Sequence, residues 1–270
     1  MIDEDVAEEV YSWRKQLKAV GANNNLDVLI HSPGGELTAC YRTARLLARY
    51  TDDWQALVPD YAASGATLIC LGSSNIVLSD IAQLGPLDPQ VLSKRNTKFF
   101  TGERQSPLEA FQAVKYLREY TLTSLDAGIV FLLRQQIAPQ LALETASKLA
   151  VELAKPILDK IEPYDLGAFG LDSSLAIDYC RRICSPKESH KKTQRDANYK
   201  TLVEKYPAHE FIIDMAEAET LGLTVCEPDD TLNDLFDELR VHLRSLQSFV
   251  GFVPQQEEED HDDEAAAHSE

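Results

Sequence analysis

The first third of the chain alternates short apolar runs with amphipathic stretches. Residues 4–20, for example, carry Val6, Val10, Trp13 and Leu17 at the spacing of one helix face. Short apolar runs separated by helical stretches are typical of parallel βα units. The expected helices cover residues 4–20, 36–50 and 64–71, and the expected strands cover residues 26–31, 55–58 and 75–78. The pattern therefore predicts an α/β fold built on a parallel sheet.

From Ser106 onward the pattern is largely helical. A polar, basic segment at residues 185–200 predicts an exposed loop, and residues 220–225 predict a helix end that feeds a last short strand. The expected helices here cover residues 107–121, 124–136, 141–155 (ended by Pro156), 171–183 and 230–250. This second part therefore reads as a helical extension of the first.

Composition narrows the function classes. The chain has 270 residues, 44% of them hydrophobic, which is enough to bury a core without disulfides or metals. Its net charge is −18, and residues 257–264 are almost entirely acidic, as in a disordered tail. Because the body has no basic patch, we expect no binding to nucleic acid or to an anionic membrane. Nothing resembles a signal peptide or a run of 18 apolar residues, so a cytoplasmic location without membrane insertion is expected.

The cysteines predict neither a disulfide framework nor a metal site. Their number, five, is odd, and the chain is long. Cys180 and Cys184 would share a helix face, but no further ligands lie near them in the sequence. A phosphate-binding Gly-x-x-x-x-Gly-Lys-Ser/Thr loop is missing from the sequence, so the chain is not expected to be an ATPase or to use a cofactor.

Ser64 is the first candidate for chemistry. It follows a strand and opens a helix, with Ala62, Ala63, Gly65 and Ala66 around it. The unpaired amides at a helix N-terminus, and its partial positive charge, suit a developing alkoxide or a tetrahedral oxyanion. A serine that merely caps a helix would have the same local sequence.

A second turn follows the strand before it. His31-Ser32-Pro33-Gly34-Gly35 places two glycines where a ligand needs close approach, and the Gly35 amide could point at a bound carbonyl. An ordinary βα turn closed by glycines would also fit. Two such turns in adjacent βα units are much rarer, and ligands bind at the C-terminal ends of such strands.

Three strings now resemble a known family: Leu-Ile-His-Ser-Pro-Gly-Gly (29–35), Val-Pro-Asp-Tyr-Ala-Ala-Ser-Gly-Ala-Thr-Leu-Ile (58–69) and Leu-Gly-Pro-Leu-Asp-Pro-Gln (84–90). Their order and spacing resemble the ClpP/crotonase superfamily, and most closely the serine dehydrogenase proteinase family, which is related to signal peptide peptidase A. The resemblance implies repeated ββα units with a helical C-terminal extension. We then expect a ClpP/crotonase-like core over residues 1–105, its helical continuation with a last strand over 106–253, and a disordered acidic tail over 254–270.

The resemblance also implies roles. Ser64 would be the nucleophile of a serine endopeptidase, and the amides of Gly35 and Gly65 would form the oxyanion hole. The general base is open between Lys115, as in Ser-Lys relatives, and His209, which falls near the position of an acidic group in Clp-type enzymes. No histidine lies between His31 and His190.

Other polar residues receive lesser roles. We expect His31 to order its loop, His190 to lie in a solvated loop, and Asp88 to brace the turn beside the site. Relatives usually carry a strand before the helix that matches residues 3–20, so either the start lies elsewhere or the sheet keeps an open edge, which invites pairing. By analogy we expect a homo-oligomer that acts on a protein or peptide. The alternatives are a non-catalytic scaffold and a crotonase-like enzyme that acts on acyl thioesters.

Overall fold

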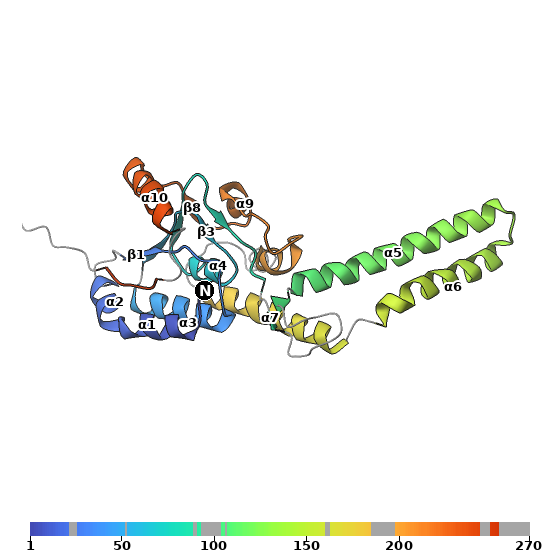
Figure 1. Ribbon diagram of the computed structural model, residues 1–270, viewed down its shortest axis with the longest axis horizontal. Coiled ribbons are helices and arrows are strands. Elements are labelled where there is room, and N and C mark those ends of the chain that lie inside the picture. The colour runs from blue at the N-terminus through green and yellow to red at the C-terminus, as the bar shows by residue number, and fades with distance from the viewer. Residues whose placement is uncertain are drawn as a thin grey trace, which may run out of the picture.

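The computed structural model describes residues 1–21, 26–51, 53–88, 91–92, 104–105, 107–159, 163–184, 198–243 and 249–253. These residues form a body around a parallel sheet, from which a long helical arm extends (Figure 1). The predicted acidic tail, residues 254–270, lies outside the described residues. The mixed α/β fold with a parallel sheet is confirmed, whereas repeated ββα units and the domain division at residue 105 stay predictions.

The main sheet has the strand order β1-β2-β4-β8, and all its pairs are parallel. Its strands are β1 (Leu26–Leu29), β2 (Trp54–Val58), β4 (Asn75–Leu78) and β8 (Val225–Cys226). The predicted last short strand is therefore β8, which pairs with β4 through Ile76 and Val225. Within the described residues β1 and β8 are the edges of this sheet.

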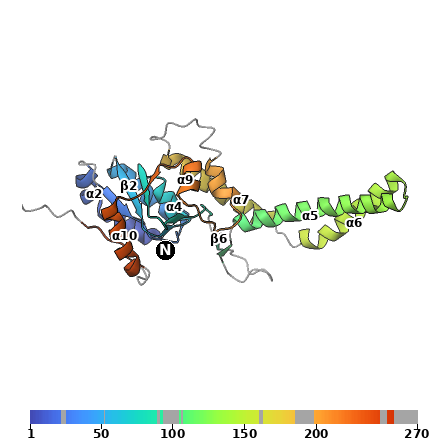
Figure 2. The same ribbon diagram turned by 90° about the horizontal axis from the view of Figure 1, so that it is seen from above.

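Helices cover both faces of the sheet, as parallel sheets require. Ala56 and Val58 of β2 face a large core formed with α1, α2, α3, α4 and α7. Leu57 points the other way and packs with Val77 and Phe236 of α10. Figure 1 shows the sheet with α1, α2 and α3 on one side and α10 on the other, and Figure 2 shows the same body from above. The helices of the body are α1 (Glu4–Ser12), α2 (Arg14–Gly21), α3 (Leu37–Tyr50), α4 (Gly65–Cys70), α7 (Pro163–Cys184), α9 (Met215–Thr220) and α10 (Asp230–Leu243), with a π-helical turn η1 (Thr201–Lys205).

The first helix prediction was too simple, because residues 4–20 form two helices that meet at Trp13. The expected exposed loop at 185–200 is wrong at its end, where residues 198–200 are helical and Tyr199 is buried. Residues 185–197, including His190, lie outside the described residues. The last helix ends at Leu243, and residues 249–250 are not helical.

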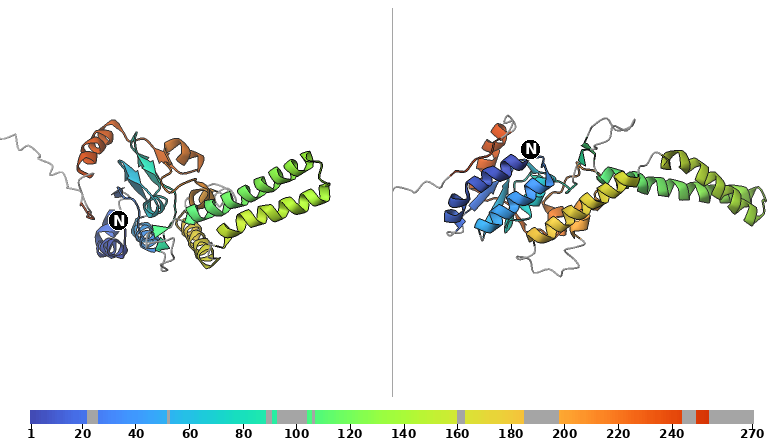
Figure 3. Two further views of the ribbon diagram at one scale, coloured as in Figure 1. Left: turned by 45° about the vertical axis from the view of Figure 1, so that its right-hand side comes forward. Right: turned by 90° about the horizontal axis from the view of Figure 1, so that it is seen from below.

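The arm is an antiparallel pair of helices, α5 (Pro107–Arg134) and α6 (Pro139–Leu158). All three ribbon figures show it leaving the body with only its base near other elements (Figure 3). The prediction of two helices with a break after Thr121 was wrong: α5 is one continuous helix, within which the Thr121 hydroxyl donates to the Leu117 carbonyl (2.8 Å). Pro156 does not end α6 either. The helix continues past this proline to Leu158.

Two very short strand pairs complete the body. β3 (Tyr61–Ala62) pairs in parallel with β5 (Gln83–Leu84), and β6 (Val91–Leu92) pairs in antiparallel with β7 (Arg104–Gln105). In the part of the chain that the structure describes, no helix is long and apolar enough to cross a membrane.

Candidate active site

A short ladder places four segments side by side next to the main sheet. Ser32 bridges Ala62 in parallel, Ala62 pairs with Leu84 in parallel, and Leu84 bridges Ile213 in antiparallel. In the last bridge the amides of Leu84 and Ile213 each donate to the other's carbonyl (2.9 Å). The ladder therefore aligns four stretches that lie far apart in the sequence.

Each segment of the ladder carries a candidate residue at the same end. Gly35 follows Ser32, Ser64 follows Ala62 and Asp88 follows Leu84. The segment of Ile213 runs in the opposite direction to the other three. His209, which precedes Ile213, therefore lies at the same end of the ladder as Gly35, Ser64 and Asp88.

Ser64 occupies a sharp turn between β3 and α4. Its φ is +52° and its ψ is −122°, a conformation that costs a non-glycine residue about 1–3 kcal/mol. Such strain at a serine between a strand and a helix is the geometry of a nucleophile turn, which projects the hydroxyl from the end of the sheet. The hydroxyl of the buried Ser64 donates to the Asp88 carbonyl at 3.4 Å.

The glycine turn packs directly against this serine. Gly34 has a φ of +96°, and a Cβ there would lie 2.8 Å from Ser64 Cβ and 2.9 Å from the Gly65 nitrogen. Only glycine fits both the backbone angle and the space. A Cβ on Gly65 would in turn lie 3.5 Å from the Gly35 nitrogen, so the amides of Gly35 and Gly65 are neighbours beside Ser64.

The orientation of the Gly35 amide is set by the start of the chain. Ile2 bridges Gly35 in parallel, with its amide donating to the Gly34 carbonyl (2.9 Å) and its carbonyl accepting from the Glu36 amide (2.8 Å). In this pattern the N–H of Gly35 itself points away from Ile2. This bridge was not predicted, and nothing in the local sequence of Ile2 signals it.

The turn that carries Asp88 is fixed by backbone contacts. The Thr67 hydroxyl bonds to the carbonyls of Ala62 (2.9 Å) and Gly85 (2.8 Å), which ties α4 to this turn. The Leu87 amide donates to the Leu202 carbonyl (3.0 Å) at η1. Asp88 is fully buried between the serine and the segment that follows η1.

His209 reaches this turn from the late part of the chain. Its Nδ1 lies 3.4 Å from Oδ2 of Asp88, and its side chain is 19% exposed. Asp88 thus contacts Ser64 through its backbone carbonyl and His209 through its carboxylate. The sequence assigned Asp88 only a bracing role. The sequence signal for a role in the site is that this acid lies between Pro86 and Pro89, just after the strand β5.

The other candidate base lies elsewhere. Lys115 is exposed on α5, and nothing described there removes its head group from water. His31 is half-buried, and its ring makes an edge contact with the ring of Tyr61 (centroids 4.4 Å apart); its role in ordering the loop stays a prediction. Cys40 packs against Gly65, but burial raises the pKa of its thiol to about 12, so it is no competing nucleophile.

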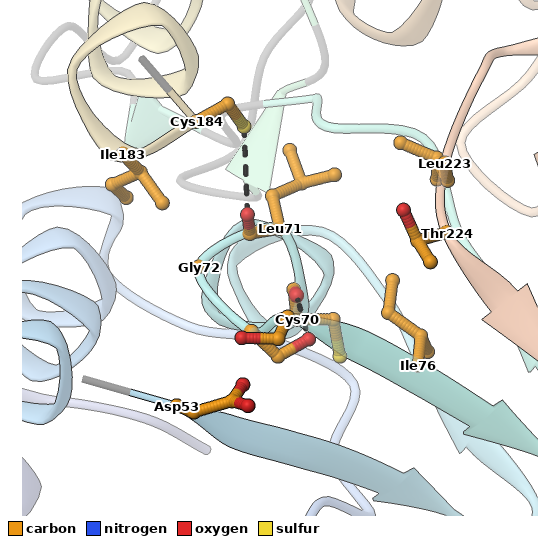
Figure 4. A pocket seen from close by; sticks show the side chains of 11 residues that line it. Asp53, Cys70, Leu71, Gly72, Ile76, Ile183, Cys184, Leu223 and Thr224 are labelled. Atoms are coloured by element: carbon orange, nitrogen blue, oxygen red, sulfur yellow. Dashed lines mark hydrogen bonds between the residues drawn. The ribbon is translucent and has the colours of Figure 1, made fainter. Parts of the chain in front are cut away.

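Two cavities lie outside the group formed by Ser64, Asp88 and His209, and the larger one reaches the start of the glycine turn at His31, Ser32 and Pro33. The smaller, about 400 Å³, opens between Asp53, Gly72, Cys184 and Thr224 at the N-terminal ends of β2, β4 and β8, opposite to Ser64 (Figure 4). The Cys184 thiol donates across it to the Leu71 carbonyl (3.5 Å). The larger, about 1040 Å³, is mainly apolar and lies between α1, β1 and α10. Neither is lined by Ser64, Asp88 or His209.

Comparison with known proteins finds a family for the first part of the chain. Residues 2–105 match the model of the ClpP-like SDH-type serine proteinases. Two uncharacterized proteins of Methanocaldococcus jannaschii are similar. MJ0137 is 36% identical over 77 residues, which are 28% of this chain and 27% of that protein. MJ1495 is 36% identical over 66 residues, which are 24% of this chain and 23% of that protein.

The matched stretch is therefore about a quarter of each of these relatives. The family match, in contrast, includes the three strings that suggested the resemblance, from the glycine turn to the turn of Asp88. Residues 2–105 are thus similar to the ClpP-like SDH-type serine proteinases.

Proposed function

We propose that the chain is a serine peptidase in which Ser64 is the nucleophile, His209 the general base and Asp88 the carboxylate that positions His209. One observation carries the proposal: Asp88 contacts both Ser64 and His209, although these residues are distant in the sequence. The family match supports hydrolysis of peptides in general.

The chemistry follows from the placement of the groups. Nε2 of His209, the nitrogen opposite the one that faces Asp88, accepts the proton of Ser64 as Oγ attacks the scissile carbonyl carbon. The amides of Gly35 and Gly65 donate to the oxyanion that forms. The imidazolium then gives its proton to the leaving amine, and water repeats the sequence on the acyl-enzyme. Before attack, Ser64 must release the Asp88 carbonyl.

His209 is preferred over Lys115 for a physical reason. A lysine acts as a base near neutral pH only when burial disfavours its charged form, and Lys115 is exposed. The imidazole of His209 is mostly buried and lies beside a fully buried carboxylate, as in an orienting pair.

The first test is labelling with a fluorophosphonate probe. The Ser64→Ala variant should lose all labelling and peptide hydrolysis while keeping its thermal unfolding temperature. Ser73→Ala is the matched control, since the Ser73 hydroxyl bonds to the backbone carbonyls of Cys70 and Asn75 at the opposite end of the sheet. Labelling that survives Ser64→Ala would contradict the proposal.

A second test separates the two bases. His209→Gln should reduce kcat by about three orders of magnitude, as loss of a general base does. Lys115→Gln should leave kcat within a factor of about two, because an exposed lysine does not touch the reacting atoms. The reverse result would assign the base to Lys115.

Two other functions have distinct outcomes. A non-catalytic scaffold predicts no probe labelling in the native chain. An enzyme of acyl thioesters predicts thermal stabilisation by coenzyme A without labelling of Ser64. We also propose that residues 106–253 continue the core formed by residues 1–105 and that residues 254–270 are a tail. The reason is that residues 106–253 supply both β8 of the main sheet and His209 of the proposed site.

A further inference from the structure

The contact between α5 and α6, which we call the seam of the arm, is made by small side chains. Ala142, Ala146, Ala150 and Ala154 recur at every fourth position of α6, and all are buried against α5. A Cβ on Gly128 of α5 would lie only 3.1 Å from Ala146 Cβ, so the two helices approach closely. The seam therefore uses small residues, and the large apolar residues of both helices lie outside it.

Six of these large residues share one face of the arm. On a helix, the residues just before each seam position lie along one side of the seam. In an antiparallel pair, the sides that precede the seam on both helices belong to the same face. The residues of this face, which we call the leucine–aromatic face, are Tyr116, Tyr120, Phe131, Leu141, Leu149 and Leu153.

This face is open to solvent in the described structure. Its six side chains are between 41% and 71% exposed. They offer on the order of 700 Å² per copy, close to the roughly 800 Å² that each partner contributes to a standard protein interface. Monomeric proteins rarely expose apolar patches of this size.

The opposite face is less suited to burial. The positions that follow the seam include Leu122, Leu133, Leu143 and Val151, but also the charged Arg118 and Lys155. Burying such charges without partners costs free energy, whereas the leucine–aromatic face holds no charged residue among its six members.

The charge of the arm favours a second copy of the chain as its partner. Residues 107–158 contain five acidic and five basic residues, whereas the whole chain has a net charge of −18. Two copies can therefore meet at their arms without the repulsion that their bodies would produce. The back of α6 alternates Glu144, Lys148 and Glu152, unlike the Lys- and Arg-rich polar face of helices that lie on membranes.

We propose that the leucine–aromatic face binds the same face of a second copy of the chain, so that two arms form a four-helix bundle around a two-fold axis. This inference concerns assembly and stands independently of the proposed peptidase function.

The test is the molar mass of the full chain in solution, measured by sedimentation velocity at about 1–100 µM. The native chain should be a dimer. Leu149→Glu, which places a charge in the centre of the face, should raise the dissociation constant at least about a hundredfold. Val151→Glu is the matched control: it adds the same charge to the same helix, at a residue that is 58% exposed on the opposite side of the seam.

The outcomes separate clearly. Dimers that persist in Val151→Glu and dissociate in Leu149→Glu, with unchanged circular dichroism in both, support the proposal. A native monomer at about 100 µM overturns it, as do equal effects of the two variants. Flotation with neutral or anionic lipid vesicles is measured in parallel, and a native monomer that binds vesicles through Leu149 would replace the second copy by a membrane.

Discussion

Replacing Asp88 by asparagine tests the proposed site most directly. The substitution keeps the shape of the side chain and keeps the backbone carbonyl that accepts from Ser64. It removes only the negative charge that lies 3.4 Å from Nδ1 of His209. If Asp88 positions the base, the variant should bind peptide normally and turn it over slowly.

The size of the loss follows from the distance. A charge pair at this separation is worth about 5 kcal/mol at an effective dielectric constant of about 20. Because His209 is 19% exposed, solvent screening lowers the benefit to about 3–5 kcal/mol for the imidazolium that forms during attack. At about 1.4 kcal/mol per factor of ten, kcat should fall by about two to four orders of magnitude. The equivalent change in a serine-protease triad costs about 10⁴.

The assay is hydrolysis of a fluorogenic casein or peptide substrate, with kcat and KM determined separately. We expect KM to stay within about twofold, since Asp88 is buried behind the site rather than exposed to substrate. Asp53→Asn is the control, because Asp53 is an exposed carboxylate beside the smaller cavity, at the other end of the sheet.

A merely structural role for Asp88 would give another result. The Asp88→Asn chain would then lose thermal stability, and its remaining folded fraction would keep the native kcat. A kcat within about threefold of the native value in a fully folded variant would refute the reasoning.

Three further predictions follow from the packing. Gly34→Ala should destabilise the fold by about 3 kcal/mol in urea unfolding and reduce probe labelling, because the φ of +96° and the contact with Ser64 leave no room for a methyl group; full labelling at native stability would contradict this. In the native chain one thiol of five, the half-buried Cys226, should react with Ellman's reagent at pH 8, and all five should react in urea; a native count of two or more would contradict the burial pattern. Above pH 9 the free energy of unfolding should fall, because unfolded thiols ionise near 9.0 whereas Cys40 and Cys70 stay protonated to about 12 when folded. At pH 10 each of these two thiols should lower the free energy of unfolding by about 1.4 kcal/mol. Between pH 8 and pH 10 the free energy of unfolding of a variant with both Cys40→Ala and Cys70→Ala should therefore fall by about 3 kcal/mol less than that of the native chain.

The parts of the fold that depend on neighbouring residues were predictable. The strands at residues 55–58 and 75–78 lie almost where their apolar runs indicated, and Ser64 opens α4 as its small neighbours suggested. The positive φ of Ser64 was not predictable, because it results from the packing of the glycine turn on one side and the turn of Asp88 on the other.

The parts that depend on distant contacts were missed. Nothing near His209 indicates Asp88 as its neighbour, because the bridge between Leu84 and Ile213 brings them together. The expected break between residues 121 and 124 is absent, because α5 continues through them and the Thr121 hydroxyl bonds to the Leu117 carbonyl inside the helix. The exposed face of the arm escaped prediction because apolar residues on both sides of an alanine seam suggest a buried helix.

The ladder that ends at Ile213 also determines when the proposed site can form during synthesis of the chain. The segment with Ser64 leaves the ribosome early, whereas His209 follows about 145 residues later, which takes roughly 10–30 s at ordinary elongation rates. Until Ile213 pairs with Leu84, the nascent chain holds a strained serine without the histidine proposed as its base. The proposed peptidase, assembled in this order, would be inactive toward its own unfinished chain, and toward neighbouring nascent chains, until Ile213 has paired with Leu84.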